Sequence, residues 1–134
     1  MKNFYKKFQI ISHLPGWRLY LRSVYKKALF DASNLNRLTI ENRTQPTCLL
    51  CGVSGEITGD EFIKFILGRN ENSKIIIIDV GDEQIQSVTD LVKNKYQDKY
   101  IDVRKANALD LQFIEDKSID WIDTDGFFSF FDET

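Results

Sequence analysis

Cysteine and histidine are scarce in this chain, which has two cysteines, Cys48 and Cys51, and one histidine, His13. These residues cannot supply the four Cys or His ligands of a structural zinc site. The cysteines form a C-x-x-C, but leucines fill its middle and a predicted strand surrounds it, whereas a thioredoxin-type motif starts a helix with an exposed thiol. On a strand the two side chains would point to opposite faces. We therefore expect two buried, inert cysteines and no metal site.

The chain also lacks a long apolar run. No stretch approaches the ~20 consecutive apolar residues of a membrane-spanning helix. The first residues, MKNFYKKFQIISHL, contain lysines but neither the apolar core nor the small-residue cleavage site of a secretory signal. With 43% hydrophobic and 28% charged residues among 134, the composition is that of a soluble protein with enough residues for one domain. We expect a cytoplasmic protein without a membrane span.

Charge is distributed unevenly along the chain. The totals are 18 Lys and Arg against 20 Asp and Glu, a net charge of −2. Residues 1–40 hold eight of the bases and one acid, Asp31, which gives +7; the remaining ten bases and nineteen acids give −9. The basic part could meet an anionic substrate, nucleic acid or a membrane surface. We favour a solvated helical face, because the cations are spread along the segment.

Residues 1–46 are predicted to form an N-terminal helical extension. The turn LPGW at 14–17 opens a helix over 17–32 that has apolar residues at helical spacing and a basic, solvated face. The apolar positions are Leu21, Val24, Tyr25, Ala28 and Leu29, and the basic positions are Arg18, Arg22, Lys26 and Lys27. A polar stretch, ENRTQPT, follows this helix, and Pro46 favours an extended entry into the next segment.

From residue 47 onward the pattern is that of a parallel sheet. TCLLC (47–51) and KIIIIDV (74–80) are continuously apolar, as strands are when helices cover both faces of a parallel sheet. YIDVRKA (100–106) and SIDWIDT (118–124) are weaker candidate strands. Helical segments separate the first three strands, so the chain reads as right-handed βαβ units. The predicted fold class is α/β, with a doubly wound, mostly parallel sheet.

Both connecting helices carry recognisable sequence signals. The first is predicted over 58–68, where Thr58 and Glu61 form a capping box and Gly68 provides a left-handed stop. The second is predicted over 82–96 from its apolar stripe. Each helix would pack one apolar side against the sheet.

The carboxyl ends of the first two strands are the predicted ligand site, because ligands of such sheets bind there, beside the point where strand order reverses. Gly52, Ser54, Gly55 and Gly59 allow a sharp turn and the close approach of a ligand beside a helix N-terminus. Asp79 would lie beside this turn and could accept hydrogen bonds from ribose hydroxyls. The structural alternatives are a turn without a ligand and an N-cap role for Asp79, which Asp82 could fill equally well.

The third strand is followed by Asn107 and Asp110, which could reach an adenine edge but are also ordinary turn formers. An adenosine-containing ligand leaves a nicotinamide dinucleotide and S-adenosylmethionine as candidates. The sequence GVSGEITG does not fit the G-x-G-x-x-G dinucleotide fingerprint. Glu56 and Asp60 near the turn would also repel a pyrophosphate. The charges favour S-adenosylmethionine, whose sulfonium centre is positive.

Four segments in order, CLLCGVSGEITG, IIIIDV, VRKANALDL and EDKSIDWIDTDGFF, resemble the Rossmann-like, class I S-adenosylmethionine-dependent methyltransferases. The resemblance covers residues 47–131 and implies a Rossmann-like cofactor-binding half-domain at 47–134, with S-adenosylmethionine as cofactor. The cofactor-binding residues that it implies are Gly52, Val53, Ser54, Gly55, Asp79, Val80, Asn107, Ala108 and Asp125. Because the family's sheet continues past the fourth strand, we expect an incomplete sheet: a fragment lacking its C-terminal half, a degenerate copy, or a chain completed by self-association or another partner.

The resulting hypothesis is an S-adenosylmethionine-dependent methyltransferase, or its cofactor-binding fragment, that acts on an unknown acceptor. No catalytic residue is assigned, although Asp123 or Asp125 could act as a general base if the acceptor must lose a proton. A non-catalytic interaction module is the alternative, in which the basic helix and the phenylalanines of 127–131 dock a partner, since an exposed aromatic patch indicates an interface. A NAD-binding oxidoreductase fragment is the weaker alternative.

Overall fold

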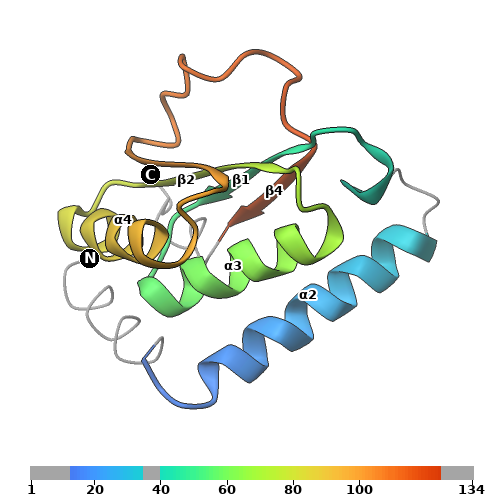
Figure 1. The fold of residues 1–134 in the computed structure, drawn as a ribbon, viewed down its shortest axis with the longest axis horizontal. Coiled ribbons are helices and arrows are strands. Elements are labelled where there is room, and N and C mark those ends of the chain that lie inside the picture. The colour runs from blue at the N-terminus through green and yellow to red at the C-terminus, as the bar shows by residue number, and fades with distance from the viewer. Residues whose placement is uncertain (1–12, 35–39, 125–134) are drawn as a thin grey trace, which may run out of the picture.

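The computed structural model describes residues 13–34 and 40–124 (Figure 1). Helix α2 (Trp17–Asn34) and the short 3-10 helix η1 (Ile40–Asn42) precede the sheet. The strands are β1 (Thr47–Cys51), β2 (Lys74–Asp79), β3 (Tyr100–Lys105) and β4 (Trp121–Thr124), while α3 (Glu56–Arg69) connects β1 to β2 and α4 (Asp82–Lys95) connects β2 to β3. None of these helices is both long and apolar enough to cross a membrane.

The four strands form one parallel sheet in the order β3-β2-β1-β4. Strand β1 pairs with β2 from Thr47 opposite Lys74 to Cys51 opposite Ile78, and its other edge pairs with β4. The chain therefore builds outward from β1 to β3 and then crosses back to add β4 on the other side of β1. The predicted α/β class with a parallel sheet is confirmed, and the strand order reverses beside β1.

The two faces of the sheet are covered differently, as Figure 1 shows. On one face, Cys48 and Leu50 of β1 and Ile75 and Ile77 of β2 lie in a buried cluster with side chains of α2, α3 and α4. On the opposite face, the coil between β3 and β4 covers a second cluster, made of Leu49, Cys51, Ile76 and Ile78 with Ala106, Ala108, Leu111, Ile114 and Ile119. Both strands are apolar at successive positions because both faces are covered. Within the described ranges, all α-helices lie on one side of the sheet.

Helix α2 packs directly on α3. Leu21 and Tyr25 are buried there, and the Tyr25 ring stacks on Phe65 of α3 with the ring centroids 4.5 Å apart. Phe65 in turn lies 5.6 Å from the ring of Trp121 in β4, again between centroids. The helix predicted over 17–32 is confirmed and extends two residues further, but Val24 is 41% exposed, because the contact side of α2 is centred on Leu21 and Tyr25.

The predicted start of α3 is wrong. The helix begins at Glu56, and its N-cap, Gly55, makes no side-chain capping hydrogen bond. Thr58 and Glu61 therefore lie inside the helix instead of forming a capping box. Both are buried and bond to groups elsewhere in the protein: Thr58 bonds to a side chain of the glycine turn, and Glu61 bonds to α2.

The predicted end of α3 is wrong as well. Gly68 lies within the helix, which continues to Arg69 and is followed by Asn70 in an extended conformation. Among the glycines that the structure describes, Gly52 alone has a φ in the left-handed region. The backbone N–H of Asn70 donates to the carbonyl oxygen of Ile66, so the last turn is closed without a left-handed residue.

Candidate functional site

The turn after β1 depends on Gly52. Its φ of 81° lies in the left-handed region, which favours glycine. Its N–H donates a hydrogen bond of 2.8 Å to the carbonyl oxygen of Ile78 in β2. This bond fixes the start of the turn to the carboxyl end of the neighbouring strand. A residue with a side chain at position 52 would strain the backbone.

Asp79, the last residue of β2, connects two turns. Its Oδ2 accepts a hydrogen bond from the backbone N–H of Val53 at 2.8 Å, and its Oδ1 accepts one from the N–H of Gly81 at 2.7 Å. The residue is 7% exposed. The acid and the glycine turn, which the sequence predicted to be neighbours, are therefore in direct contact. A carboxylate oxygen can accept more than one hydrogen bond, so these contacts fix the position of Asp79 without excluding a ligand.

The glycine turn presents its backbone more than its side chains. Val53 is 1% exposed and Ser54 is 5% exposed, whereas Gly52 and Gly55 are partly exposed. A ligand at this turn would therefore meet main-chain groups. The imidazole of His13 lies beside Gly55, with Cε1 3.6 Å from the place where a Cβ on that glycine would lie.

A chain of hydrogen bonds joins the turn to α2. The Trp17 indole N–H donates to Oγ1 of Thr58 at 3.0 Å, and that oxygen lies 2.7 Å from Oγ of Ser54. Ser54 and Thr58 are both buried. The N-terminal helix thus contacts the predicted ligand site through side chains that the sequence did not single out for it.

The end of β3 lies beside Asp79, whose carbonyl oxygen accepts the N–H of Ala106 at 3.0 Å. Asn107 follows and is exposed, but its Oδ1 accepts the N–H of Leu109 at 3.0 Å and its carbonyl oxygen accepts the N–H of Asp110 at 2.9 Å. Asn107 therefore forms a turn, which is the structural alternative that the sequence left open. It lies at the same edge of the sheet as the glycine turn and Asp79.

The remaining predicted site residues differ in accessibility. Val80 is 61% exposed, next to Asp79. Ala108 packs into the cluster on the coil-covered face. Asp123, at the end of β4, accepts a hydrogen bond from the Tyr25 hydroxyl at 2.8 Å. Asp125 and the phenylalanines of 127–131 lie outside the described residues.

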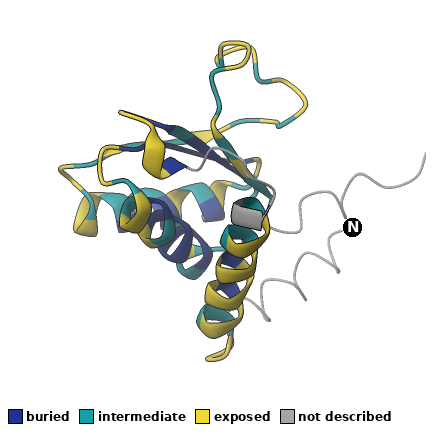
Figure 2. Cartoon of the chain, turned by 90° about the vertical axis from the view of Figure 1, so that its right-hand side faces the viewer, coloured by how far each residue is buried: buried dark blue, intermediate teal, exposed yellow. Residues whose placement is uncertain are grey.

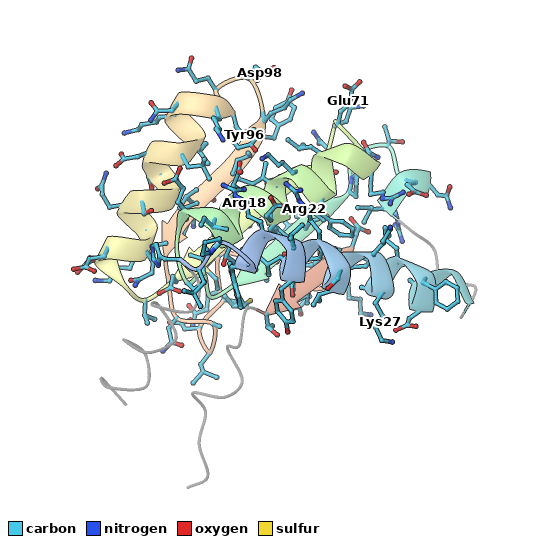
Figure 3. The ribbon with its side chains drawn as sticks, turned by 90° about the horizontal axis from the view of Figure 1, so that it is seen from below. Arg18, Arg22, Lys27, Glu71, Tyr96 and Asp98 are labelled. Carbon is cyan, nitrogen blue, oxygen red and sulfur yellow. The ribbon has the colours of Figure 1, made fainter. Side chains whose placement is uncertain are left out.

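Two buried acids of α3 form an ion-pair cluster with α2 and α4. Asp60, whose side chain is 0% exposed, accepts from Arg18 at 2.7 Å, from Lys64 at 2.8 Å and from the Tyr96 hydroxyl at 2.6 Å. Glu61 accepts from Arg18 at 2.9 Å and from two nitrogens of Arg22, each at 3.0 Å. Figure 3 labels Arg18, Arg22 and Tyr96 in this layer of helices. Electrostatic contacts thus tie α2 and the end of α4 to α3.

The cluster shifts the pKa values of its members. Burial alone would raise the pKa of Asp60, but the hydrogen bonds from Lys64, Tyr96 and Arg18 outweigh it and hold this pKa well below its usual range. The pKa of Glu61 is lowered too, because the hydrogen bonds from Arg22 and Arg18 outweigh its burial. Burial and the bond to Asp60 raise the pKa of Tyr96. Both acids are therefore ionised at neutral pH.

The predicted position of Asp60, beside the ligand, is wrong. The sequence placed Asp60 near the glycine turn, where it would repel a pyrophosphate. The structure instead turns its carboxylate toward Arg18 of α2 and Tyr96 at the end of α4, and Lys64 of α3 itself binds it as well. The predicted solvated basic face holds for Arg22, whose side chain is 57% exposed, while Arg18 is 35% exposed, and both arginines also bind these acids. Glu56, exposed in the first turn of α3, remains near the glycine turn.

The two cysteines are buried thiols on opposite faces of β1, as predicted. Burial, with a smaller contribution from Asp120, raises the pKa of Cys48 to about 12, and burial, with a smaller contribution from Asp123, raises that of Cys51 to about 11. A thiol with so high a pKa is a poor nucleophile at neutral pH. Among residues 13–34 and 40–124, no group of three or more His, Cys, Asp or Glu side chains is placed to hold a metal ion.

A separate hollow of about 260 Å³ lies between the start of α3 and one side of α4. It is lined by Glu56, Ser87, Asp90, Leu91, Asn94 and Lys95. Among these, Glu56 alone was placed near the predicted site by the sequence. The hollow is therefore distinct from the turn, the acid and the end of β3 that the sequence brought together.

The structure thus brings the turn at 52–55, Asp79 and Asn107 to one edge of the sheet, and it adds Trp17, Thr58 and His13, which sequence reasoning missed. The available signal was weak: Trp17 begins the apolar stripe of a helix and reads as an ordinary core residue. Comparisons of this chain with protein-family models, curated proteins and solved structures found no match.

Proposed function

We propose that this chain is an S-adenosylmethionine-dependent methyltransferase, or the cofactor-binding part of one, built on a doubly wound, Rossmann-like sheet that the described strands form only in part. The proposal rests on one observation. The backbone N–H of Val53 in the glycine turn donates to Asp79 at 2.8 Å, so the turn and the acid lie side by side at the carboxyl ends of β1 and β2. The strand order β3-β2-β1-β4 reverses beside β1, which is where ligands of open α/β sheets bind.

The residues at this edge fit an adenosine-containing cofactor. Asp79 is held by two backbone N–H groups, which would orient its oxygens for ribose hydroxyls. Val80 offers an exposed apolar surface beside it for a base. The turn at 52–55 offers main chain without bulky side chains to the amino-acid end of the cofactor. Asn107 follows the neighbouring strand, within the same group of loops.

In a methyl transfer, the main task of the protein is to place the cofactor and the acceptor relative to each other. The cofactor supplies an electrophilic methyl group, which passes to the acceptor while the sulfonium becomes a neutral thioether. The chain's own residues would hold the nucleoside, align the acceptor and exclude water. Asp123 bonds to Tyr25, and this contact fixes its orientation at the end of β4. We assign it no proton-transfer role.

A nicotinamide dinucleotide is the competing ligand at the same edge. With Asp60 turned away, Glu56 is the one acid of the two that still lies where it would repel a pyrophosphate. The spacing of the glycines still does not match the dinucleotide fingerprint. Binding of the two ligands must therefore be compared directly.

The test is isothermal titration calorimetry of the full chain with S-adenosylhomocysteine and, separately, with NAD⁺. We expect S-adenosylhomocysteine to bind and NAD⁺ to give no heat. Val80→Lys should weaken the binding at least about tenfold, since an apolar contact of ~1–2 kcal/mol is lost and a bulky side chain intrudes. Tyr100→Lys is the matched control, because Tyr100 is 65% exposed at the opposite end of β3.

Two results would contradict the proposal. The first is no affinity for S-adenosylhomocysteine up to millimolar concentration in a folded sample. The second is an equal effect of Val80→Lys and Tyr100→Lys, which would place the ligand elsewhere. NAD⁺ binding that is lost in Val80→Lys would favour the oxidoreductase alternative.

A non-catalytic interaction module is the second candidate, and one observation favours it. Leu19, Tyr20 and Phe30 on α2 are 68%, 56% and 65% exposed, and Figure 2 shows that the outward side of this helix is exposed along much of its length. Exposed apolar groups with Lys26 and Lys27 between them suit a docking surface. Size-exclusion chromatography tests this candidate: it predicts concentration-dependent association that Leu19→Ser with Phe30→Ser abolishes, and a monomer at all concentrations would count against it.

A further inference from the structure

Two side chains of α2 form hydrogen bonds that end at the two strands flanking the reversal of strand order. Trp17 donates to Thr58, which is bonded to Ser54 in the turn after β1. Tyr25 donates to Asp123 at the end of β4. Helix α2 therefore contacts both the turn at which the proposed cofactor would bind and the end of the strand on the other side of β1.

The hydrogen bond from Trp17 is one of several attachments of α2 to the rest of the protein. Arg18 and Arg22 attach the same helix to Asp60 and Glu61 through four hydrogen bonds between 2.7 and 3.0 Å. Tyr25 adds a stacked contact with Phe65. The indole N–H of Trp17 instead reaches a hydroxyl that has a second, buried hydroxyl as its neighbour in the glycine turn.

The chemistry of these groups fixes the direction of the first bond in the chain, whereas either hydroxyl can donate in the second. An indole N–H can only donate, so Oγ1 of Thr58 must be the acceptor for Trp17. A hydroxyl has two lone pairs and one proton, so the same oxygen can also bond to Ser54. Loss of the Thr58 hydroxyl would remove one hydrogen bond from Trp17 and one from Ser54.

We propose that Trp17, acting through Thr58, is a positioning residue that holds the turn at 52–55 in the conformation that receives the cofactor. This inference rests on the proposed function for the identity of the ligand, but not for the ordering of the turn. It links α2 to the affinity of a site at the carboxyl end of β1. The basic N-terminal helix is then part of the binding site and not a separate appendage.

The experiment compares four single variants of the full chain and one double variant, Trp17→Phe with Thr58→Val. Trp17→Phe keeps a ring but removes the N–H donor, Thr58→Val removes the hydroxyl at nearly constant volume, and Thr58→Ser retains it. Arg22→Gln is the control, because it loosens the attachment of α2 without touching the turn. Amide hydrogen exchange of the peptide covering 49–57 reports the order of the turn, and calorimetry reports affinity for S-adenosylhomocysteine.

We expect Trp17→Phe and Thr58→Val to speed amide exchange in the turn and to weaken S-adenosylhomocysteine binding about fivefold, the value of one ordinary hydrogen bond. The double variant should bind no more weakly than Thr58→Val alone, because both changes break the same chain of hydrogen bonds. Thr58→Ser should behave like the wild type in the turn, and Arg22→Gln should leave exchange at 49–57 unchanged.

The inference is overturned if Trp17→Phe leaves exchange in the turn unchanged, or if Arg22→Gln changes it equally. Failure of the wild-type chain to bind S-adenosylhomocysteine is a different outcome. It would overturn the proposed function, while faster exchange in the Trp17→Phe turn would still establish the positioning role.

Discussion

At the scale of single residues, the buried carboxylate of Asp60 depends on its hydrogen-bonding and ion-pair partners. It has no exposed side-chain surface and stays ionised because Arg18, Lys64 and Tyr96 bond to it. A buried charge that loses its partners is strongly destabilising, whereas a well-paired one is roughly neutral. The cluster therefore matters most when one member is removed.

Asp60 should make stability depend on acid pH. Folding lowers its pKa, so its contribution is complete above the unfolded value of about 3.9 and declines as the pH falls from there toward the folded value. Asp60→Asn should lower the free energy of unfolding at pH 7 by about 3 kcal/mol. The gap between variant and wild type should narrow below pH ~4. Urea denaturation at pH 7 and at pH 3 measures both effects.

Asp98→Asn is the control for this prediction, because Asp98 is 81% exposed and pairs only loosely with Lys99, at 3.9 Å. It should change stability by less than about 0.5 kcal/mol at either pH. A gap for Asp60→Asn that stays constant with pH would show that the Asp60 carboxyl titrates normally.

At the scale of secondary-structure elements, the attachment of α2 depends unequally on two arginines one helical turn apart. The Arg18 side chain is 35% exposed and bonds to both Asp60 and Glu61, whereas that of Arg22 is 57% exposed and bonds to Glu61 alone. Arg18→Met should cost about 2–3 kcal/mol, because it removes a partner from two buried carboxylates. Arg22→Met should cost less than about 1 kcal/mol, as exposed pairs do. Denaturant titration of both variants checks the order, and equal losses would contradict it.

Two glycines of α3 should respond oppositely to alanine. At Gly68 an added Cβ would meet open space, with no neighbouring side chain within 4 Å, so Gly68→Ala should gain up to about 1 kcal/mol of helix propensity. At Gly59 the added Cβ would lie 3.2 and 3.3 Å from the two methyl carbons of Val88 in α4, which offsets that gain. Thermal melts should rank Gly68→Ala above wild type and above Gly59→Ala. A lower melting temperature for Gly68→Ala would indicate that residue 68 adopts a left-handed backbone.

The ends of the elements show which signals in the sequence were reliable. Strand β1 has the predicted bounds, and β2 is one residue shorter than predicted. These strands were predictable because burial on both faces produces a continuous apolar run, which is a distinctive sequence pattern. Strand β4 begins at Trp121 and not at residue 118, since Ser118 closes a turn onto Glu115. The capping box failed because α3 begins two residues before Thr58, at Glu56. The Thr58 hydroxyl bonds instead to Ser54, four residues earlier, and to Trp17 of α2.

The candidate site was predictable only where topology decides it. Parallel strands bring their carboxyl ends to one edge, so the contact between the glycine turn and Asp79 followed from the order of the elements. The ion-pair cluster and the Trp17 contact depend on which side of α2 meets α3. Arg18 lies at the border of the apolar stripe of α2, and sequence spacing alone does not say which acids it will meet.

At the scale of the whole molecule, the two thiols report on opening of the sheet. Cys48 and Cys51 are 0% and 5% exposed and face opposite sides of a strand that has neighbours on both edges. With pKa values of about 12 and about 11, few of these thiols are ionised at pH 8, and the thiolate is the form that attacks a disulfide reagent. We expect both to react slowly with a disulfide reagent, at one rate that rises with urea. Rapid reaction of either thiol in the native protein would contradict this.

Strand β1 pairs with one strand that follows it closely in the sequence and with one that follows much later, and this order has a consequence for synthesis. Strand β2 follows after one helix, whereas the hydrogen bond from Thr47 to Asp120 beside β4 spans 73 positions. At translation speeds of ~5–20 residues per second, the apolar edge of β1 waits roughly 4–15 s for its second partner. Nascent chains therefore carry an uncovered strand edge, a known starting point for aggregation, and expression at low temperature or with abundant chaperones should raise the soluble yield.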